Sequence, residues 1–245
     1  MKATDRAAHV LAALHARYPD ATCTLDFRAP WQLLVAAILS AQCTDARVNI
    51  ITESLFRRFP TLEAMAQAPV ETIEDEIRSC GLFRGKARHI SGACCLILEQ
   101  HAGQVPTDRD LLVRLPGVGR KIANLILGDC HGIPAIVVDT HCIRISGLIG
   151  FTSHKDPLKV ERDLAAVLPE SEWIDYGHLV VAHGRDICIA RRPQCGRCPV
   201  LPYCQLGSGQ AAGHEAGHAA DQTEECEMAA ADSRMASLNG DDRHA

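Results

Sequence analysis

Hydrophobic positions recur at helical spacing through most of the first two hundred residues. Val10, Leu11 and Leu14 share one face of the segment 3–17, which is the spacing of an amphipathic helix. Residues 31–40 are apolar almost all round, and Pro30 suits the first position of a helix, so a buried helix is predicted there. The pattern predicts a nearly all-helical body in which only residues 136–138 are extended.

Capping and stop residues set the ends of the remaining helices. Thr44, Thr61 and Thr107 are predicted N-caps. Gly81 and Gly103 are predicted to end helices at their C-termini. The predicted helices cover residues 3–17, 30–40, 45–59, 62–67, 70–80, 85–101, 108–114, 120–130, 140–149, 157–168 and 171–183.

The character of the chain changes after Cys204. Residues 207–245 carry few large apolar groups, eight acids and two bases, and we predict a disordered acidic tail there. The net charge is −5 for the whole chain but +1 for residues 1–206, so the overall acidity does not argue against a nucleic-acid partner. Ten of the 23 bases of residues 1–206 fall in three groups, which are Arg84, Lys86 and Arg88; Arg114, Arg120 and Lys121; and Arg185, Arg191, Arg192 and Arg197.

The chain shows no apolar run of membrane-spanning length, and we expect no membrane partner. The amphipathic segment 3–17 could mimic a transit peptide, but Asp5 favours a core helix. Twelve cysteines without a secretory segment indicate a reducing compartment.

Four of the cysteines fall within 17 residues, at Cys188, Cys195, Cys198 and Cys204. Four thiolates in a loop-forming stretch suit either zinc or a [4Fe–4S] cluster. A single CxxC pair flanked by single cysteines favours the cluster, although spacing alone leaves zinc open. We expect the bound group to have a structural role.

A second motif, LPGVGRK, joins two predicted helices at residues 115–121. Gly117 and Gly119 permit a tight turn, and the turn leads into a helix N-terminus, where free N–H groups attract a phosphate. The motif is a helix–hairpin–helix pattern rather than a Walker loop, because Ile122 follows Lys121. An ordinary corner between two helices is the alternative.

Asp139 directly follows an apolar run, and two roles are open to it. It can cap the next helix. It can also be a carboxylate held near Lys121, whose amine we expect to be desolvated by neighbours at a helix start and so activated as a nucleophile.

Together these features resemble the endonuclease III family of the helix–hairpin–helix DNA glycosylase superfamily, over about residues 5–206. The resemblance rests on LSAQCTD at 39–45, Gly81-Leu82, the 115–121 hairpin, VDTH at 138–141 and the four-cysteine loop. It departs from the family at Cys43, where alanine is common, and in the acidic tail.

The resemblance implies an all-α, two-lobed fold with the active site in the cleft between the lobes. Residues 23–133 would form a six-helix barrel lobe, and residues 1–22 with 134–206 an iron–sulfur cluster lobe. Lys121 would be the nucleophile, Asp139 the catalytic carboxylate, and the four cysteines the [4Fe–4S] ligands. The residues expected to face or enter DNA are Gln42, Leu82, Leu115, Gly117, Val118, Gly119, Arg120 and His141.

The implied function is a bifunctional DNA glycosylase and abasic-site lyase of base excision repair. The expected partner is double-stranded DNA with a damaged pyrimidine or an abasic site, cleaved on the 3′ side by β-elimination. We expect a monomer in the cytoplasm of a prokaryotic-type cell, associated with the nucleoid. The alternatives are a pyrimidine-dimer or mismatch glycosylase on this scaffold, an adenine glycosylase, which would lack Lys121, and a non-catalytic iron–sulfur DNA-binding or redox module.

Overall fold

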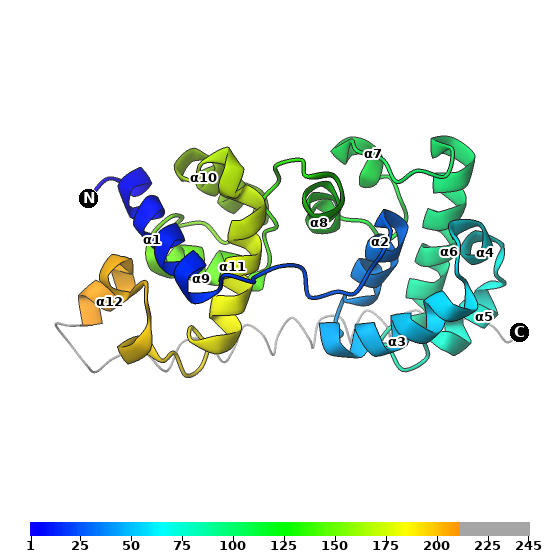
Figure 1. The fold of residues 1–245 in the computed structure, drawn as a ribbon, viewed down its shortest axis with the longest axis horizontal. Coiled ribbons are helices and arrows are strands. Elements are labelled where there is room, and N and C mark those ends of the chain that lie inside the picture. Colours follow the sequence, from blue (N-terminus) through cyan, green and yellow to red (C-terminus); the bar gives the residue numbers. More distant parts are fainter. Residues whose placement is uncertain (211–245) are drawn as a thin grey trace, which may run out of the picture. The chain divides into compact units, whose positions relative to one another are not determined.

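The computed structural model describes residues 1–210, which form helices joined by irregular loops (Figure 1). No strand occurs in this part of the chain, and the predicted all-α class is confirmed. Residues Met1–Gly207 form one compact unit, and residues 208–210 are the last that the structure describes.

The helices follow one another in the order α1 (Ala3–Arg17), α2 (Pro30–Leu39), α3 (Asp45–Arg58), α4 (Leu62–Gln67), α5 (Val70–Glu76), α6 (Phe83–His101), α7 (Arg109–Leu112), α8 (Arg120–His131), α9 (Thr140–Ile149), α10 (Pro157–Val167), α11 (Trp173–Asp186) and α12 (Gln205–Gln210). Short 3-10 turns lie at Glu170–Glu172, Cys195–Arg197 and Leu201–Tyr203.

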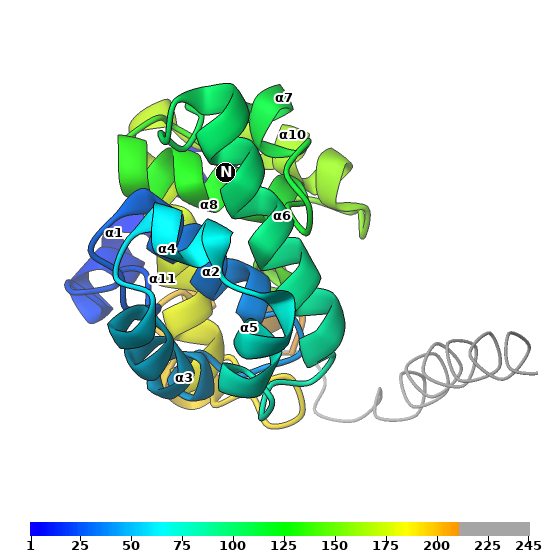
Figure 2. The same ribbon diagram turned by 90° about the vertical axis from the view of Figure 1, so that its right-hand side faces the viewer.

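The first hydrophobic core is built around α2. Every residue of its segment 33–39 is buried, because this helix is apolar all round and can be covered on every side. It packs against α3, α6 and α8, and α4 and α5 cover α6 (Figure 2). The core residues of this barrel lobe come from residues 25–135.

The second hydrophobic core combines the two ends of the described chain. Buried residues of α1 at positions 7–14 pack with residues 136–200, and α1 contacts α10 and α11. We call this the cluster lobe. The predicted domain bounds stay a prediction, since a division of buried residues does not test independent folding. Residues 207–210 of the predicted tail lie in α12, and residues 211–245 lie outside the described residues.

Most of the predicted helix limits are confirmed within two residues. Thr44 and Thr61 accept the expected capping hydrogen bonds at the starts of α3 and α4. Three details were wrong. The helix from Val70 ends at Glu76, Asp108 rather than Thr107 caps α7, and the helix predicted to end at residue 183 continues to Asp186.

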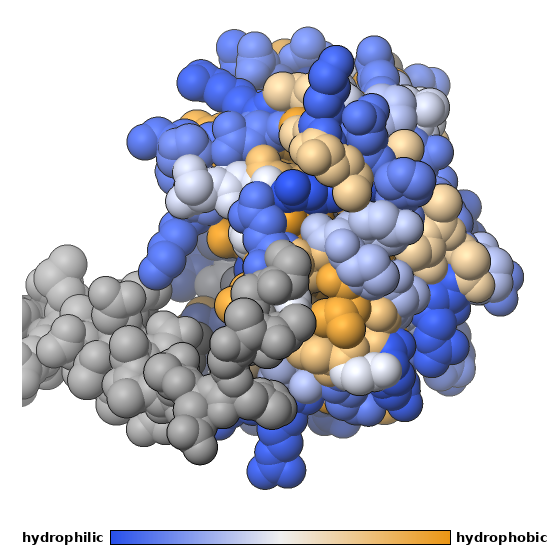
Figure 3. Space-filling view, turned by 90° about the vertical axis from the view of Figure 1, so that its left-hand side faces the viewer, coloured by the Kyte–Doolittle hydropathy of each residue, from blue (hydrophilic) through white to orange (hydrophobic). Residues whose placement is uncertain are grey.

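The surface seen from the cluster-lobe side is mainly hydrophilic, with a smaller hydrophobic area (Figure 3). Among the described residues, no helix is both long and apolar enough to cross a membrane.

Candidate active site

The hairpin between α7 and α8 is fixed by packing on one side and by a left-handed glycine. Gly117 has φ +77°, and a Cβ there would lie 2.9 Å from the Cβ of His89. Leu115 and Val118 flank it with their side chains buried in the barrel core. These two predicted DNA-facing residues can therefore offer only backbone groups to a ligand, and their side chains anchor the turn.

The start of α8 leaves backbone donors without a protein partner. Gly119 is its N-cap residue, and no side chain caps this helix. The first N–H groups of a helix have no partner within the helix, so these groups can bind an anion. Lys121 is the second residue of α8 and is exposed. The predicted desolvation of its amine stays a prediction.

Arg120, the first residue of α8, is held by an ion pair that the sequence did not reveal. Its Nε and Nη2 donate to the two carboxylate oxygens of Glu161 in α10, at 2.7 and 2.8 Å. This pairing raises the pKa of Arg120. Its predicted contact with DNA is therefore available through its backbone N–H, and the side chain would first have to leave Glu161.

Asp139 caps α9, as one of its two sequence interpretations predicted. Its Oδ1 accepts a hydrogen bond from the backbone N–H of Cys142 at 2.7 Å. No hydrogen bond to Oδ2 is seen among the described residues. The cap fixes the carboxylate rigidly, which is compatible with a chemical role for the second oxygen.

Several charged groups act on one another around Lys121. Burial lowers the pKa of His141, the charge of Asp139 opposes this shift, and Lys121 adds to it. Burial would raise the pKa of Asp45, but hydrogen bonds from Thr24 and Arg185 lower it overall, and Lys121 lowers it further. Lys121 and Asp139 therefore both act on His141, so the two predicted catalytic groups belong to one electrostatic neighbourhood.

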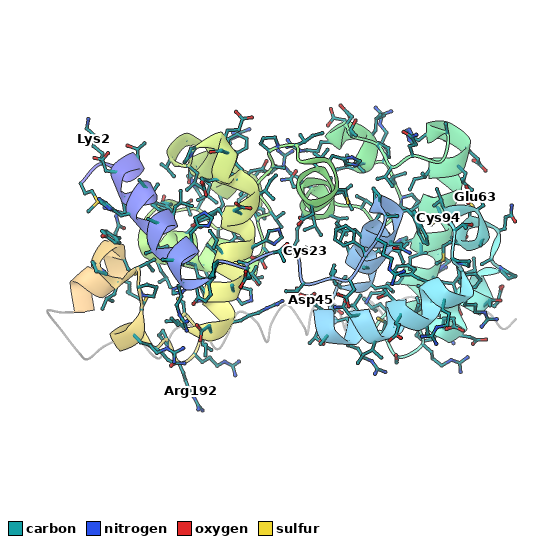
Figure 4. All side chains as sticks on the ribbon, in the orientation of Figure 1. Lys2, Cys23, Asp45, Glu63, Cys94 and Arg192 are labelled. Carbon is teal, nitrogen blue, oxygen red and sulfur yellow. The ribbon has the colours of Figure 1, made fainter. Side chains whose placement is uncertain are left out.

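The barrel and cluster lobes are tied together beside these residues. Arg185 at the end of α11 donates to Asp45 at 2.7 Å, and Thr24 donates to the same oxygen at 2.6 Å. Asp45 lies at the first residue of α3, at the end of that helix nearest α11 (Figure 4). His178 and Asp129 form a further link between α11 and α8 at 2.9 Å. These contacts fix the two sides of the site relative to each other.

The ring of His141 lies close to the backbone of Gly184. A Cβ on Gly184 would lie 2.3 Å from its Nδ1, so only glycine fits beneath this ring. Its Nδ1 lies 3.5 Å from Nη2 of Arg144. The ring is half-buried, so this predicted DNA-facing residue presents only part of its surface.

Gln42 and Leu82 both stand out as exposed residues with left-handed backbone. Their φ angles are +54° and +58°, and Leu82 is 67% exposed. A left-handed conformation costs a non-glycine residue about 1–2 kcal/mol. Leu82 is not part of the hydrophobic core. Strain and an exposed apolar side chain in the same place mark a functional position.

The segment that carries Gln42 is anchored by a buried lysine. Lys86 in α6 is 4% exposed, and its Nζ donates to the carbonyl oxygens of Leu39 and Ala41 at 2.9 and 2.6 Å. Carbonyls at the end of α2 would otherwise lack partners, and an ammonium group there also favours the helix dipole. The same lysine lies one helical turn beyond Leu82, so it fixes both exposed residues relative to each other.

The four cysteines of the C-terminal loop lie close enough for their charges to interact. The Cys198 thiol has its pKa raised first by burial and then by Cys188, Cys204 and Cys195. Arg144 donates to the sulfur of Cys188 at 3.3 Å, while Ile187 and Val200 bury the ends of the loop. Four half-buried thiols with a nearby guanidinium suit an anionic iron–sulfur cluster with four thiolate ligands.

Two of the four arginines in the basic group Arg185, Arg191, Arg192 and Arg197 form ion pairs within the protein. Arg185 pairs with Asp45, and Arg197 pairs with Asp186. Arg191 and Arg192 are exposed, and Arg192 points away from the body (Figure 4).

Asp45, Lys86, Glu161 and Arg185 are the functional neighbours whose roles the sequence did not reveal. Their partners are 21 to 140 residues away along the chain. The only local signal was Asp45 itself, at the end of the LSAQCTD motif.

Two family models match the chain. Residues 35–170 match the HhH-GPD superfamily of base excision DNA repair proteins. Residues 188–204 match the iron–sulfur binding domain of endonuclease III, and these are the limits of the four-cysteine loop. The chain therefore carries a [4Fe–4S] cluster, with the four cysteines as the proposed ligands.

Known proteins agree with both matches. Endonuclease III of Synechocystis sp. is 46% identical over 82% of this chain and 92% of its own length. Endonuclease III of Escherichia coli K12 is 41% identical over 80% of this chain and 93% of its own length. A solved endonuclease III trapped in a covalent intermediate with DNA is 42% identical, with a TM-score of 0.80 over 86% of this chain and all of that one. A thermostable thymine-DNA glycosylase shares the fold at 19% identity and a TM-score of 0.75.

Family-model matches in both lobes, together with relatives that align over four-fifths of the sequence, lead to one conclusion: the chain belongs to the endonuclease III family of base excision DNA repair proteins.

Proposed function

We propose that this protein is a DNA glycosylase and abasic-site lyase that removes damaged pyrimidines from duplex DNA. The observation that carries the proposal is the exposed Lys121 at the uncapped start of α8, in the same electrostatic neighbourhood as the rigidly capped Asp139. The protein acts as a monomer on DNA in the nucleoid.

The reaction begins with the flipping of the damaged nucleotide out of the duplex, since an amine cannot reach the sugar of a stacked base. Leu82 and Gln42 enter the space that the base leaves. Both residues are exposed and have left-handed backbone, so their side chains are free to contact DNA.

Lys121 then attacks C1′ of the sugar, and the base leaves with the electron pair of the glycosidic bond. Asp139 accepts a proton from the amine and stabilises positive charge on the sugar through the oxygen that is not used in capping. The resulting Schiff base makes C2′ acidic. Loss of the C2′ proton expels the 3′ phosphate, so covalent catalysis divides a hard step into easier ones.

The hairpin holds the DNA strand for this chemistry. The free N–H groups of residues 119–121 bind a phosphate, and the buried Leu115 and Val118 keep the turn rigid. The [4Fe–4S] cluster, when bound, supplies a crosslink between four thiolates. Its loop then presents Arg191 and Arg192 to the DNA backbone.

Paired substitutions of the two catalytic residues test the proposal. Lys121→Gln should abolish base release and strand cutting in single-turnover assays, because the amine is lost. Binding to DNA should weaken only modestly, by the loss of one charge.

Asp139→Asn separates the two roles of Asp139. Asparagine caps a helix about as well as aspartate, so the melting temperature should hold. The cleavage rate should fall by about 100-fold or more, because the carboxylate acts mainly in the transition state. A variant that cuts at the parental rate would reduce Asp139 to a cap alone.

Leu82→Ala tests insertion separately from chemistry. Leu82 is 67% exposed, so stability should change by less than about 0.5 kcal/mol. Affinity for duplex DNA with a damaged pyrimidine should fall, while affinity for undamaged duplex should not. Equal effects on both duplexes would contradict insertion.

A further inference from the structure

Two thiols from distant parts of the chain meet behind the proposed insertion residues. The sulfur of Cys80 lies 3.7 Å from the sulfur of Cys43, although the residues are 37 positions apart. Cys80 is 2% exposed, while Cys43 is half-buried. Neither cysteine belongs to the four-cysteine loop or to the active site described above.

Each thiol lies within two residues of one of the two residues with left-handed backbone. Cys43 follows Gln42, and Cys80 precedes Gly81 and Leu82. A Cβ on Gly81 would lie 3.9 Å from the carbonyl oxygen of Gln42, so the backbones of the two segments also pass close together. Lys86 hydrogen-bonds Ala41 and keeps this arrangement fixed. A covalent bond between the two sulfurs would therefore act directly on the geometry of Gln42 and Leu82.

The two thiols differ in their access to solvent. Burial raises the pKa of Cys80 to about 11, and its hydrogen bond to Cys43 adds to the shift. Cys80 is also out of reach of solvent, so an oxidant does not meet this thiol first. Cys43 is the accessible member and meets an oxidant first.

We propose that Cys43 and Cys80 form an oxidisable pair, which a hydroperoxide converts into a disulfide that ties the two insertion segments together and weakens binding to damaged DNA. The effect on DNA rests on the proposed function, while the disulfide itself does not.

The reaction balances in two steps. The Cys43 thiol reduces the hydroperoxide to an alcohol, or hydrogen peroxide to water, and becomes a sulfenic acid. The Cys80 thiol then displaces that hydroxyl group, forming the S–S bond and releasing water. A thiol reductant reverses the bond by exchange, as expected for a transient disulfide in a reducing compartment.

The bond would disturb insertion because the sulfurs must approach further. A disulfide holds its sulfurs at about 2.0 Å, whereas they now lie 3.7 Å apart. The two segments must shift toward each other. Gln42 and Leu82, with φ values of +54° and +58°, have few alternative backbone conformations to adopt during such a shift.

The test uses the holoprotein with its cluster, and the hydrogen peroxide dose is kept at the level that leaves the cluster's visible absorption unchanged. After alkylation of free thiols and trypsin digestion, mass spectrometry should find the peptides 29–47 and 79–84 joined, since each contains a single cysteine. Affinity for a damaged duplex should fall by about fivefold or more, and dithiothreitol should restore it.

Two variants serve as controls. Cys43→Ala should bind DNA like the reduced parent and should not respond to peroxide. Cys95→Ala removes another half-buried thiol of the barrel lobe, which donates to Ala66 instead of a cysteine, and it should respond like the parent. Peptide mapping repeated on Lys121→Gln keeps this test independent of catalysis.

The proposal is overturned if the joined peptides are absent at that dose, if Cys43→Ala loses affinity as the parent does, or if the disulfide forms and affinity does not change. Failure of the proposed insertion role is recognised separately, by Leu82→Ala binding damaged DNA as the parent does.

Discussion

The barrel lobe and the cluster lobe contribute one side of the site each, but they are stabilised in different ways. The barrel lobe buries a continuous aliphatic core around α2, and its hairpin is anchored by Leu115 and Val118. In the cluster lobe, the segment after α11 contains only 3-10 turns and a short final helix. The four cysteines of this segment are the proposed cluster ligands, and their bonds to the cluster would stabilise a loop that buries few apolar side chains.

This difference predicts how much stability each kind of substitution should cost. In the barrel lobe, a lost side chain leaves a small cavity in a well-packed core. In the cluster loop, a lost thiolate removes a bond on which the folding of the loop depends. Similar changes in the two lobes should therefore have very different effects.

The largest expected effect comes from removing a cluster ligand. Cys198→Ala should lose the cluster's visible absorption, and the cluster lobe should lose its cooperative melting transition, because metal binding and folding are coupled. The matched change Cys94→Ala lies in the barrel core at 0% exposure and should cost about 1–2 kcal/mol, with the cluster intact. Similar stability losses in the two variants would break the comparison.

A smaller effect is expected within the hairpin itself. Gly117→Ala places a side chain at φ +77° and against His89, so it should lower stability by about 1–3 kcal/mol. Gly119→Ala has no atom within 4 Å of the added Cβ, and it should change stability by less than about 0.5 kcal/mol. Because that Cβ lies on the side expected to face phosphate, DNA binding should still weaken. Thermal melting and DNA titration of both variants would check this, and equal melting temperatures would contradict the anchoring role of the turn.

The smallest expected effect on stability comes from the Asp45–Arg185 ion pair, which joins the two lobes. The pKa of Asp45 is lowered overall by Thr24 and Arg185, although burial alone would raise it. A depressed folded pKa gives stability that is present above the unfolded value of about 3.9 and is lost as the pH falls through the folded value. Asp45→Asn should cost less than about 1 kcal/mol near pH 7.

The difference between Asp45→Asn and the parent should shrink as the pH falls below about 5. Asp20→Asn, at an exposed residue of the loop after α1, is the control and should match the parent. Chemical denaturation at several pH values measures both variants. A constant difference for Asp45→Asn over the whole range would show that its ion pair does not contribute.

Local signals predicted much of this structure. Helix periods, threonine caps and Pro30 gave the limits of α1 to α4 within a residue or two, because each signal acts within one or two turns. The end of α5 was missed because residues 77–80 continue the apolar period while the backbone leaves the helix.

Long-range partners could not be predicted from local patterns. Nothing near Arg120 in the sequence indicates Glu161, and nothing near Cys43 indicates Cys80. The exposure of Lys121 was also missed, since the motif indicates a helix start but not what covers it. The roles of Lys121 and Asp139 rest on the motif and on family membership, and only chemistry can test them.

Borohydride trapping tests the central claim most directly. The parent protein, mixed with a duplex that carries one oxidised pyrimidine and then reduced, should form a covalent adduct, and peptide mapping should locate it on Lys121. Lys121→Gln should bind the same duplex and give no adduct, because no amine remains to form the Schiff base. An adduct formed by Lys121→Gln at the parental rate would show that another amine is the nucleophile and would contradict the assignment.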